Sequence, residues 1–152
     1  IDVSVIHLIR EPQAVAHAWL KQRFDPGRES SMSRYGVQRT MLFWAGRQLL
    51  AERLARRLPY LRIRYEDFAS RPGQTLDEIA GFVPGWEGRM PAIGEDGGVN
   101  LGVLHSLSGN PDRFATGHTR IRLDQAWQDS GDRQKLDRAR HLIGPVARRY
   151  GY

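Results

Sequence analysis

Two short apolar segments, residues 3–9 and 60–65, constrain the fold more than any other feature of this sequence. Both are rich in β-branched or aromatic residues, which is typical of strands buried in a parallel sheet. Pro12 follows the first segment, where its fixed φ suits the first turn of a helix, and Pro72 opens a helical pattern that runs to Phe82. A strand, then helices, then a second strand implies a right-handed crossover. The sequence therefore predicts an α/β fold with a parallel sheet.

A long helix is predicted between the two strands, over residues 33–58. Its apolar residues form one stripe with further apolar residues beside it, namely Trp44, Ala51, Ala55 and Leu58, flanked by Phe43, Leu50 and Leu54. Glu52 and Arg56 are expected to pair at i,i+4. We expect the arginines outside the stripe to form a solvated face rather than a nucleic-acid surface, and these are Arg47, Arg53, Arg56 and Arg57.

Turn-forming residues are dense in two other parts of the chain. Residues 24–31 and 83–117 are predicted to be loops, because glycine, proline, asparagine and serine recur there. Such long irregular segments are often functional. Residues 120–123 are predicted to form a short edge strand.

The carboxyl-terminal part is predicted to be helical. Asp124 is expected to cap a helix that carries Trp127. Residues 133–149 are predicted to form a last amphipathic helix, with an interruption at Pro145 because proline cannot donate the backbone hydrogen bond of a helix interior.

Composition narrows the class of protein. A chain of 152 residues with ordinary apolar content is expected to form a single domain, residues 1–152, and no apolar run approaches the roughly 20 residues of a membrane span. The absence of cysteine excludes disulfide scaffolds, thiolate metal sites and cysteine nucleophiles. The net charge of +6 comes almost entirely from arginine, which suits either a soluble surface or a phosphate-bearing ligand. Because the chain begins at Ile1 with an apolar strand, we expect it to be part of a longer protein.

Arg10 is the first candidate for a functional residue. It follows the first predicted strand and precedes a helix start, and ligands of parallel α/β sheets bind at this edge. The free N–H groups of a helix N-terminus favour anions, so an arginine beside them would complete a phosphate site. Pairing of Arg10 with Glu11 or another carboxylate is the alternative.

Four segments, in this order, carry a family resemblance: HLIREPQAVAHAWL, RYEDF with RPGQTL, HSLSGNPDRF and the terminal RYGY. Together they resemble the sulfotransferases that use 3′-phosphoadenosine 5′-phosphosulfate, especially the carbohydrate-sulfotransferase-like bacterial branch. The resemblance covers almost the whole chain. It implies part of a P-loop-NTPase-like fold, a three-layer parallel sheet flanked by helices that lacks its N-terminal phosphate-loop half. That loop and the general base would lie upstream of Ile1, so no catalytic residue is assigned.

The resemblance also implies roles for individual residues. Arg10 matches the arginine that binds the 3′-phosphate of the cofactor, and Ala18 stands where the family usually has a serine for the same phosphate. His17 is beside that position and could reach the phosphate instead. Tyr65 resembles the tyrosine that contacts adenine, although a tyrosine packed under the sheet with a satisfied hydroxyl would fit as well.

A loop in the third segment would complete the cofactor site. Gly109, Asn110 and Arg113 resemble a second phosphate clamp, because glycine lets the backbone approach closely and arginine supplies a forked donor. A simple turn with a surface arginine is the alternative. The histidine spacing does not predict a metal site. The adjacent acidic pairs are interpreted as helix-start charge and a solvated loop rather than as catalytic dyads.

The function expected from the resemblance is transfer of a sulfuryl group from 3′-phosphoadenosine 5′-phosphosulfate to a hydroxyl or amine of a small-molecule or carbohydrate acceptor. This chain would bind the 3′-phosphate and adenine side, and release adenosine 3′,5′-diphosphate. Residues 24–39 and 86–102 are expected to select the acceptor. We expect a cytoplasmic protein with no membrane span and no nucleic-acid partner. The alternative is a non-catalytic nucleotide-binding or interaction module on the same scaffold. Ala18 and Glu11 favour it, since the family commonly has serine and aspartate at these positions.

Overall fold

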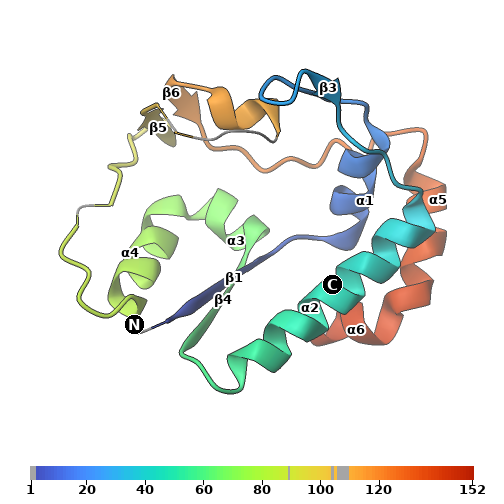
Figure 1. Ribbon diagram of the computed structural model, residues 1–152, viewed down its shortest axis with the longest axis horizontal. Coiled ribbons are helices and arrows are strands. Elements are labelled where there is room, and N and C mark those ends of the chain that lie inside the picture. The colour runs from blue at the N-terminus through green and yellow to red at the C-terminus, as the bar shows by residue number, and fades with distance from the viewer. Residues whose placement is uncertain (1–2, 89, 104, 106–109) are drawn as a thin grey trace.

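The computed structural model describes residues 3–88, 90–103, 105 and 110–152. Strand β1 (Val5–Ile9) and strand β4 (Tyr60–Arg64) form a two-stranded parallel sheet in which Val5 is opposite Tyr60 and Ile9 is opposite Arg64. Helices α1 (Pro12–Leu20) and α2 (Val37–Ala55) connect the two strands (Figure 1). The parallel pairing and the helix start at Pro12 are therefore confirmed.

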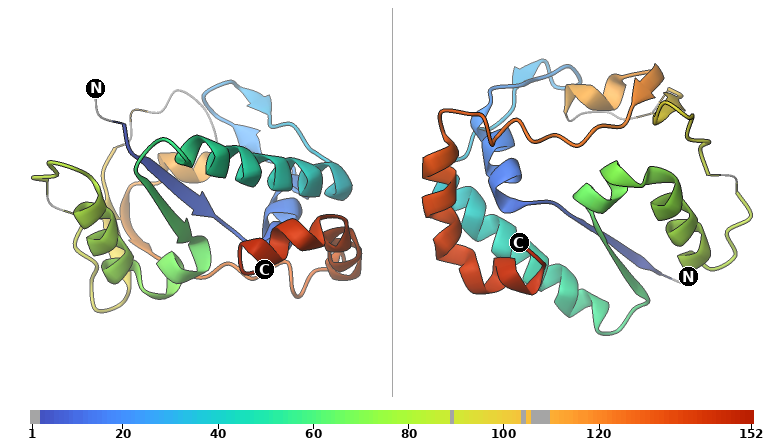
Figure 2. Two further views of the ribbon diagram at one scale, coloured as in Figure 1. Left: turned by 90° about the horizontal axis from the view of Figure 1, so that it is seen from below. Right: turned by 180° about the vertical axis from the view of Figure 1, so that it is seen from behind.

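The helices lie on two sides of this parallel pair. Helices α3 (Tyr65–Ser70) and α4 (Pro72–Phe82) follow β4 directly and lie on one side, and α4 has the predicted bounds. Helix α2 lies on the other side, together with α5 (Arg133–Arg140), η2 (His141–Ile143) and α6 (Gly144–Arg149) (Figures 1 and 2). The fold is mixed α/β, and among the described residues no helix is long and apolar enough to cross a bilayer.

The structure has two short antiparallel pairs, and three of their four strands, β2, β3 and β5, lie in segments that were predicted to be loops. Strand β2 (Phe24–Asp25) pairs with β3 (Ser30–Ser31), and β5 (Gly98–Leu101) pairs with β6 (Gly117–Arg120). The 3₁₀ helix η1 (Pro111–Phe114) lies between β5 and β6. The predicted edge strand at 120–123 is therefore three residues too late, because pairing with β5 ends at Gly98 opposite Arg120.

The carboxyl-terminal helix is also divided differently from the prediction. Its break lies at η2, where His141 begins a tighter turn, and Pro145 is in the first turn of α6. A proline there is compatible with the helix because the first N–H groups have no intrahelical partner. The predicted helix around Trp127 is wrong, since the chain forms only turns there and the Asp124 carboxylate accepts the Ala126 N–H at 3.1 Å.

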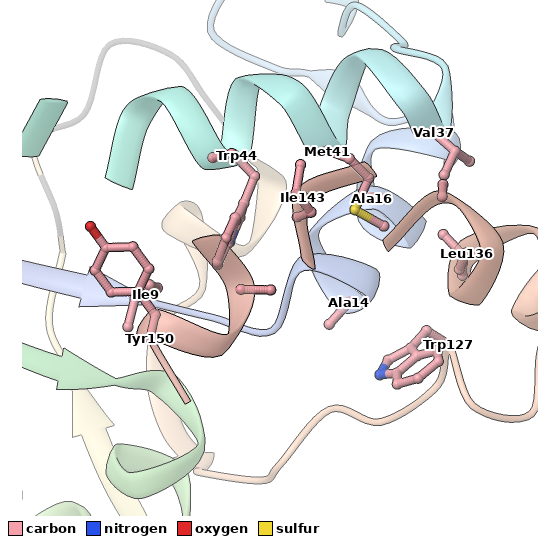
Figure 3. Close-up of a cluster of buried hydrophobic side chains, with 13 residues drawn as sticks. Ile9, Ala14, Ala16, Val37, Met41, Trp44, Trp127, Leu136, Ile143 and Tyr150 are labelled. Carbon is pink, nitrogen blue, oxygen red and sulfur yellow. The ribbon is translucent and has the colours of Figure 1, made fainter. Parts of the chain in front are cut away.

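The core lies between α1, α2 and the carboxyl-terminal helices (Figure 3). Met41 and Leu136 are completely buried, and Trp44 is 4% exposed. Of the predicted stripe of α2, Trp44 is buried, Ala51 and Ala55 are only partly buried, and Leu58 is 37% exposed. The flanking Leu50 and Leu54 are each 57% exposed. The buried face is instead formed by residues nearer the start of the helix, namely Val37, Thr40, Met41, Trp44, Ala45 and Gln48.

Glu52 also has a different partner from the predicted Arg56. Its carboxylate accepts a hydrogen bond from Arg149 Nη2 and another, at 2.8 Å, from the Tyr150 hydroxyl. These two bonds tie the second half of α2 to the end of α6, and they hold the pKa of Glu52 below its ordinary value.

Candidate functional site

A pocket of about 520 Å³ opens at the carboxyl end of β1, a size that suits a small organic ligand. Helix α1 forms one wall, and residues from four other parts of the chain complete it. Its lining residues are Arg10, Ala14, His17, Ala18, Trp19, Lys21, Arg23, Met32, Ser33, Tyr65, Asn110, Asp112, Asp124 and Trp127. The structure thus brings together Arg10, His17, Tyr65 and Asn110 of the sequence-predicted site.

Arg10 is held between an aromatic ring and a carboxylate. Its guanidinium carbon lies 4.4 Å from the centre of the Tyr65 ring, a cation–π contact. Its Nη2 donates to the Asp124 carboxylate at 2.9 Å and to the Asp124 carbonyl at 3.0 Å. The Arg10 Nε atom is buried and has no hydrogen-bond partner. The predicted carboxylate partner is therefore Asp124 rather than Glu11, and one donor of Arg10 remains unused.

The backbone that carries Arg10 is fixed from both sides. The Trp44 indole N–H donates to the Arg10 carbonyl at 2.8 Å, and the Glu66 carboxylate accepts the Glu11 N–H at 2.9 Å. The other oxygen of Glu66 accepts the Tyr152 hydroxyl at 2.6 Å. The turn between β1 and α1 is consequently anchored to α2, to α3 and to the end of the chain.

Tyr65 has the satisfied hydroxyl that one of the two predicted alternatives requires. Its ring lines the pocket and lies against Arg10. Its hydroxyl donates to the Arg122 carbonyl at 3.1 Å and accepts the Asp124 N–H at 3.2 Å. The hydroxyl is thus satisfied by the backbone, and one face of the ring is covered by the Arg10 guanidinium.

One face of α1 forms the pocket wall. Ala14 and Ala18 are four residues apart, as are His17 and Lys21, and all four line the pocket. The Nδ1 atom of His17 is buried without a hydrogen-bond partner. Burial, followed by the nearby Lys21 charge, lowers the pKa of His17, so the imidazole is neutral at pH 7. Lys21 was missed in the sequence, although its helical spacing from His17 points to it.

Arg23 is a second pocket arginine that the sequence did not indicate. Its Nη1 donates to the Asn110 side-chain oxygen at 2.6 Å and to the Asp112 carboxylate at 2.9 Å. These partners are 87 and 89 residues away in the chain, so no local pattern could reveal them. Arg113 does not line this pocket but a neighbouring groove that also contains Asn110. Gly109 lies outside the described residues.

Each pocket arginine is therefore balanced by an aspartate. The hydrogen bond from Arg10 is the largest cause that lowers the pKa of Asp124, followed by the Ala126 N–H. Asp124 is ionised at neutral pH, and its carboxylate occupies part of the Arg10 donor fork. An anion that binds to Arg10 therefore either uses a guanidinium donor that Asp124 does not occupy or displaces this carboxylate.

Glu11 provides a test of the electrostatics beside the pocket. Burial is the largest effect and raises its pKa above 4.5, although its carboxylate accepts the Trp127 indole N–H at 3.0 Å. The folded protein holds the Glu11 proton more tightly than the unfolded chain does, so ionisation of Glu11 lowers the free energy of unfolding. This loss of stability is absent below pH 4.5 and complete above the raised pKa of the folded protein.

Glu11→Gln keeps an oxygen acceptor for Trp127. It should raise the free energy of unfolding by up to about 1 kcal/mol at pH 7 and leave it unchanged near pH 4.

Urea denaturation of both proteins at the two pH values measures this difference. Glu78→Gln, on the exposed side of α4, is the matched control and should change stability little. Lower stability of Glu11→Gln at pH 7 would contradict the argument, because the bond between carboxylate and indole would then outweigh the cost of burial.

In comparisons with known proteins, no family model, curated protein or solved structure matches the chain. Within the part of the chain that the structure describes, no three histidine, cysteine or acidic residues are grouped so that they could hold a metal ion.

Proposed function

We propose that the pocket binds the 3′-phosphate and adenine side of 3′-phosphoadenosine 5′-phosphosulfate, and that the protein is a sulfotransferase. The observation that carries the proposal is that one pocket is lined by residues from three distant parts of the chain, Arg10, Tyr65 and Asn110. These are residues that the family resemblance assigned to the cofactor. The resemblance was assigned from the sequence alone and did not require these residues to lie close together. Their presence around one pocket therefore supports the assignment.

The pocket residues have the chemistry that this cofactor requires. The Arg10 guanidinium lines the pocket and can donate to a phosphate oxygen, and Lys21 and Arg23 also line the pocket and add positive charge. The Tyr65 ring offers a flat apolar face for a base. The bound cofactor would supply the sulfuryl group, and the residues of this chain would hold its phosphate and orient it toward an acceptor hydroxyl or amine of a small molecule or carbohydrate.

The proposed fold assignment is a P-loop-like sheet to which β1 and β4 contribute two parallel strands. Arg10 follows β1 at the edge where such sheets bind phosphates. Among the described residues, the edge of β1 opposite β4 has no strand partner, so a further parallel strand could pair there.

A non-catalytic nucleotide-binding module is the second candidate, and one observation favours it. Both aspartates of the pocket are ion-paired with its arginines, Asp124 with Arg10 and Asp112 with Arg23. Neither is poised to take a proton from an acceptor. Measurement of sulfuryl transfer by the full protein separates the two candidates, because the module would bind nucleotide without turnover.

Isothermal titration calorimetry tests the binding proposal directly. Adenosine 3′,5′-diphosphate should bind more tightly than adenosine 5′-monophosphate, because only the former places a phosphate on Arg10. A preference of about tenfold or more is expected for one charge-assisted contact. Equal affinities would contradict the assignment of Arg10 to the 3′-phosphate.

Ala18→Ser is expected to tighten diphosphate binding by about tenfold. Ala18 lines the pocket one helical position after His17, where a serine hydroxyl could donate to a phosphate oxygen, a bond worth roughly 1.5–3 kcal/mol. The combination with His17→Ala should keep most of the gain. Unchanged affinity in Ala18→Ser, with a large loss in His17→Ala alone, would instead make His17 the phosphate ligand.

Arg23→Ala is expected to weaken diphosphate binding more than Arg113→Ala. Arg23 lines the pocket and holds Asn110, whereas Arg113 lines only the neighbouring groove. Loss of one partly exposed cation near a phosphate should reduce affinity by about three- to tenfold. Titration of both variants checks the order, and a larger effect at Arg113 would restore the clamp predicted from the sequence.

A further inference from the structure

The outward face of α2 is unusually apolar for an exposed surface. Six large apolar side chains are more than a third exposed along this helix and the turn that follows it, namely Leu42, Phe43, Leu49, Leu50, Leu54 and Leu58. Leu42, Leu49 and Leu50 lie opposite the buried face of the helix, because successive residues are about 100° apart. Backbone hydrogen bonds from Arg56, Arg57 and Leu58 continue the turn beyond Ala55.

The charged residues on the same face are all arginines. Between Val37 and Leu58 the only acidic residue is Glu52, and its carboxylate is bound by Arg149 and Tyr150. The exposed arginines of this segment are Arg39, Arg47, Arg53, Arg56 and Arg57. Among the described residues, none of them forms an ion pair with a carboxylate.

Apolar and basic residues meet most closely at the carboxyl end of the helix. A shallow groove of about 560 Å³ is lined only by leucines and arginines, which are Leu50, Arg53, Leu54, Arg56, Arg57 and Leu58. Leu50, Leu54 and Leu58 recur every four residues and so follow one line along the surface. An occupant of this groove must offer apolar contact and negative charge together.

We propose that the outward face of α2 is a docking surface for an anionic lipid bilayer. Leucines on such a face insert into the region between headgroups and acyl chains, while arginines extend their apolar stems and place the guanidinium at the lipid phosphates. Charge complementarity favours this occupant. Among the described residues, the five arginines form no ion pair, and Glu52, the one carboxylate of this segment, is bound by Arg149, so the face matches a negative surface. The helix would lie on the membrane rather than cross it.

Two other occupants fit the surface less well. A nucleic acid would use the arginines but leave Leu50 and Leu54 in water, since phosphate-backbone binding needs no apolar stripe. A second copy of the chain would place the arginines of one copy against those of the other. That arrangement is opposed by like-charge repulsion.

Co-sedimentation of the full chain with vesicles tests the proposal. Phosphatidylcholine vesicles containing about 30% phosphatidylglycerol should bind the protein, and pure phosphatidylcholine vesicles should bind it at least about tenfold more weakly. Arg53→Gln with Arg57→Gln should weaken partitioning by about tenfold or more, since each basic residue near an anionic surface contributes about fivefold. Leu50→Ser with Leu54→Ser should also weaken it. The matched control is Arg138→Gln with Arg148→Gln, which removes two exposed arginines from α5 and α6 and should retain most of the binding.

The contradicting results are equally specific. No binding to anionic vesicles, or equal loss in the arginine pair and its control, would overturn the proposal. Binding of a duplex DNA that is lost in the arginine variant and unchanged in the leucine variant would assign the surface to nucleic acid. A dimer in sedimentation that the leucine variant converts to monomer would assign it to a second copy. Circular dichroism of each variant establishes that the fold is retained.

Discussion

Arg10→Ala is expected to weaken binding of adenosine 3′,5′-diphosphate by about 2–4 kcal/mol, or roughly thirtyfold to seven-hundredfold. Arg10 is 24% exposed, it is packed on Tyr65, and its Nε has no partner in the protein. A phosphate on this side chain would gain a charge-assisted bond in a partly desolvated site, and the substitution removes that bond completely. Calorimetric titration of the full protein measures the loss.

Asp124→Ala is the control that separates ligand contact from local structure. It breaks the same ion pair as Arg10→Ala but leaves the arginine, so its affinity should equal or exceed that of the parent protein. If Asp124→Ala weakened binding as much as Arg10→Ala, the ion pair would be needed for the shape of the pocket. Arg10 would then have no demonstrated contact with phosphate.

Trp44→Ala is expected to reduce the free energy of unfolding by about 3–5 kcal/mol, the usual loss for a large aromatic residue in a core. Trp44 is 4% exposed and contacts the Tyr150 and Tyr152 rings edge-on, with ring centres 6.1 Å apart in both pairs. Its indole N–H also donates to the Arg10 carbonyl. Urea denaturation followed by circular dichroism measures the change, because the signal does not depend on the tryptophan itself.

Trp44→Phe distinguishes the packing contribution from the hydrogen bond. It keeps most of the buried ring and removes the indole donor, so a loss of about 1–2 kcal/mol is expected. Because the bond holds the turn that carries Arg10, this variant should also bind diphosphate more weakly than its stability alone predicts. A change of less than about 1 kcal/mol in Trp44→Ala would place this residue outside the core.

Local sequence signals predicted the elements that depend on neighbouring residues. The apolar run before Arg10 and the prolines at positions 12 and 72 placed β1, α1 and α4 correctly, because proline limits where a helix can begin. The antiparallel pair β5 and β6 was not predicted as a pair. Its strands have only four residues each and are separated by a long turn-rich segment, so their periodicity is too short to recognise.

The candidate site also has features that local sequence predicted and features that it did not. The sequence alone determined that an arginine follows a strand and precedes a helix, and that residue was placed in the pocket as predicted. The pairing of Arg10 with Asp124, 114 residues away, and of Arg23 with Asp112, 89 residues away, was decided only by the tertiary structure.

The face of α2 shows the physical reason for this division. Helical spacing predicted that α2 is amphipathic. Which of its apolar residues are buried depends on how far the elements that pack against α2 extend along it. Helices α1 and α5 and the turn η2 pack against α2, in which Val37, Met41 and Trp44 are buried and Leu50 and Leu54 are exposed. Backbone conformation responds to adjacent residues, whereas burial and ion pairing require groups that folding brings together from distant parts of the chain.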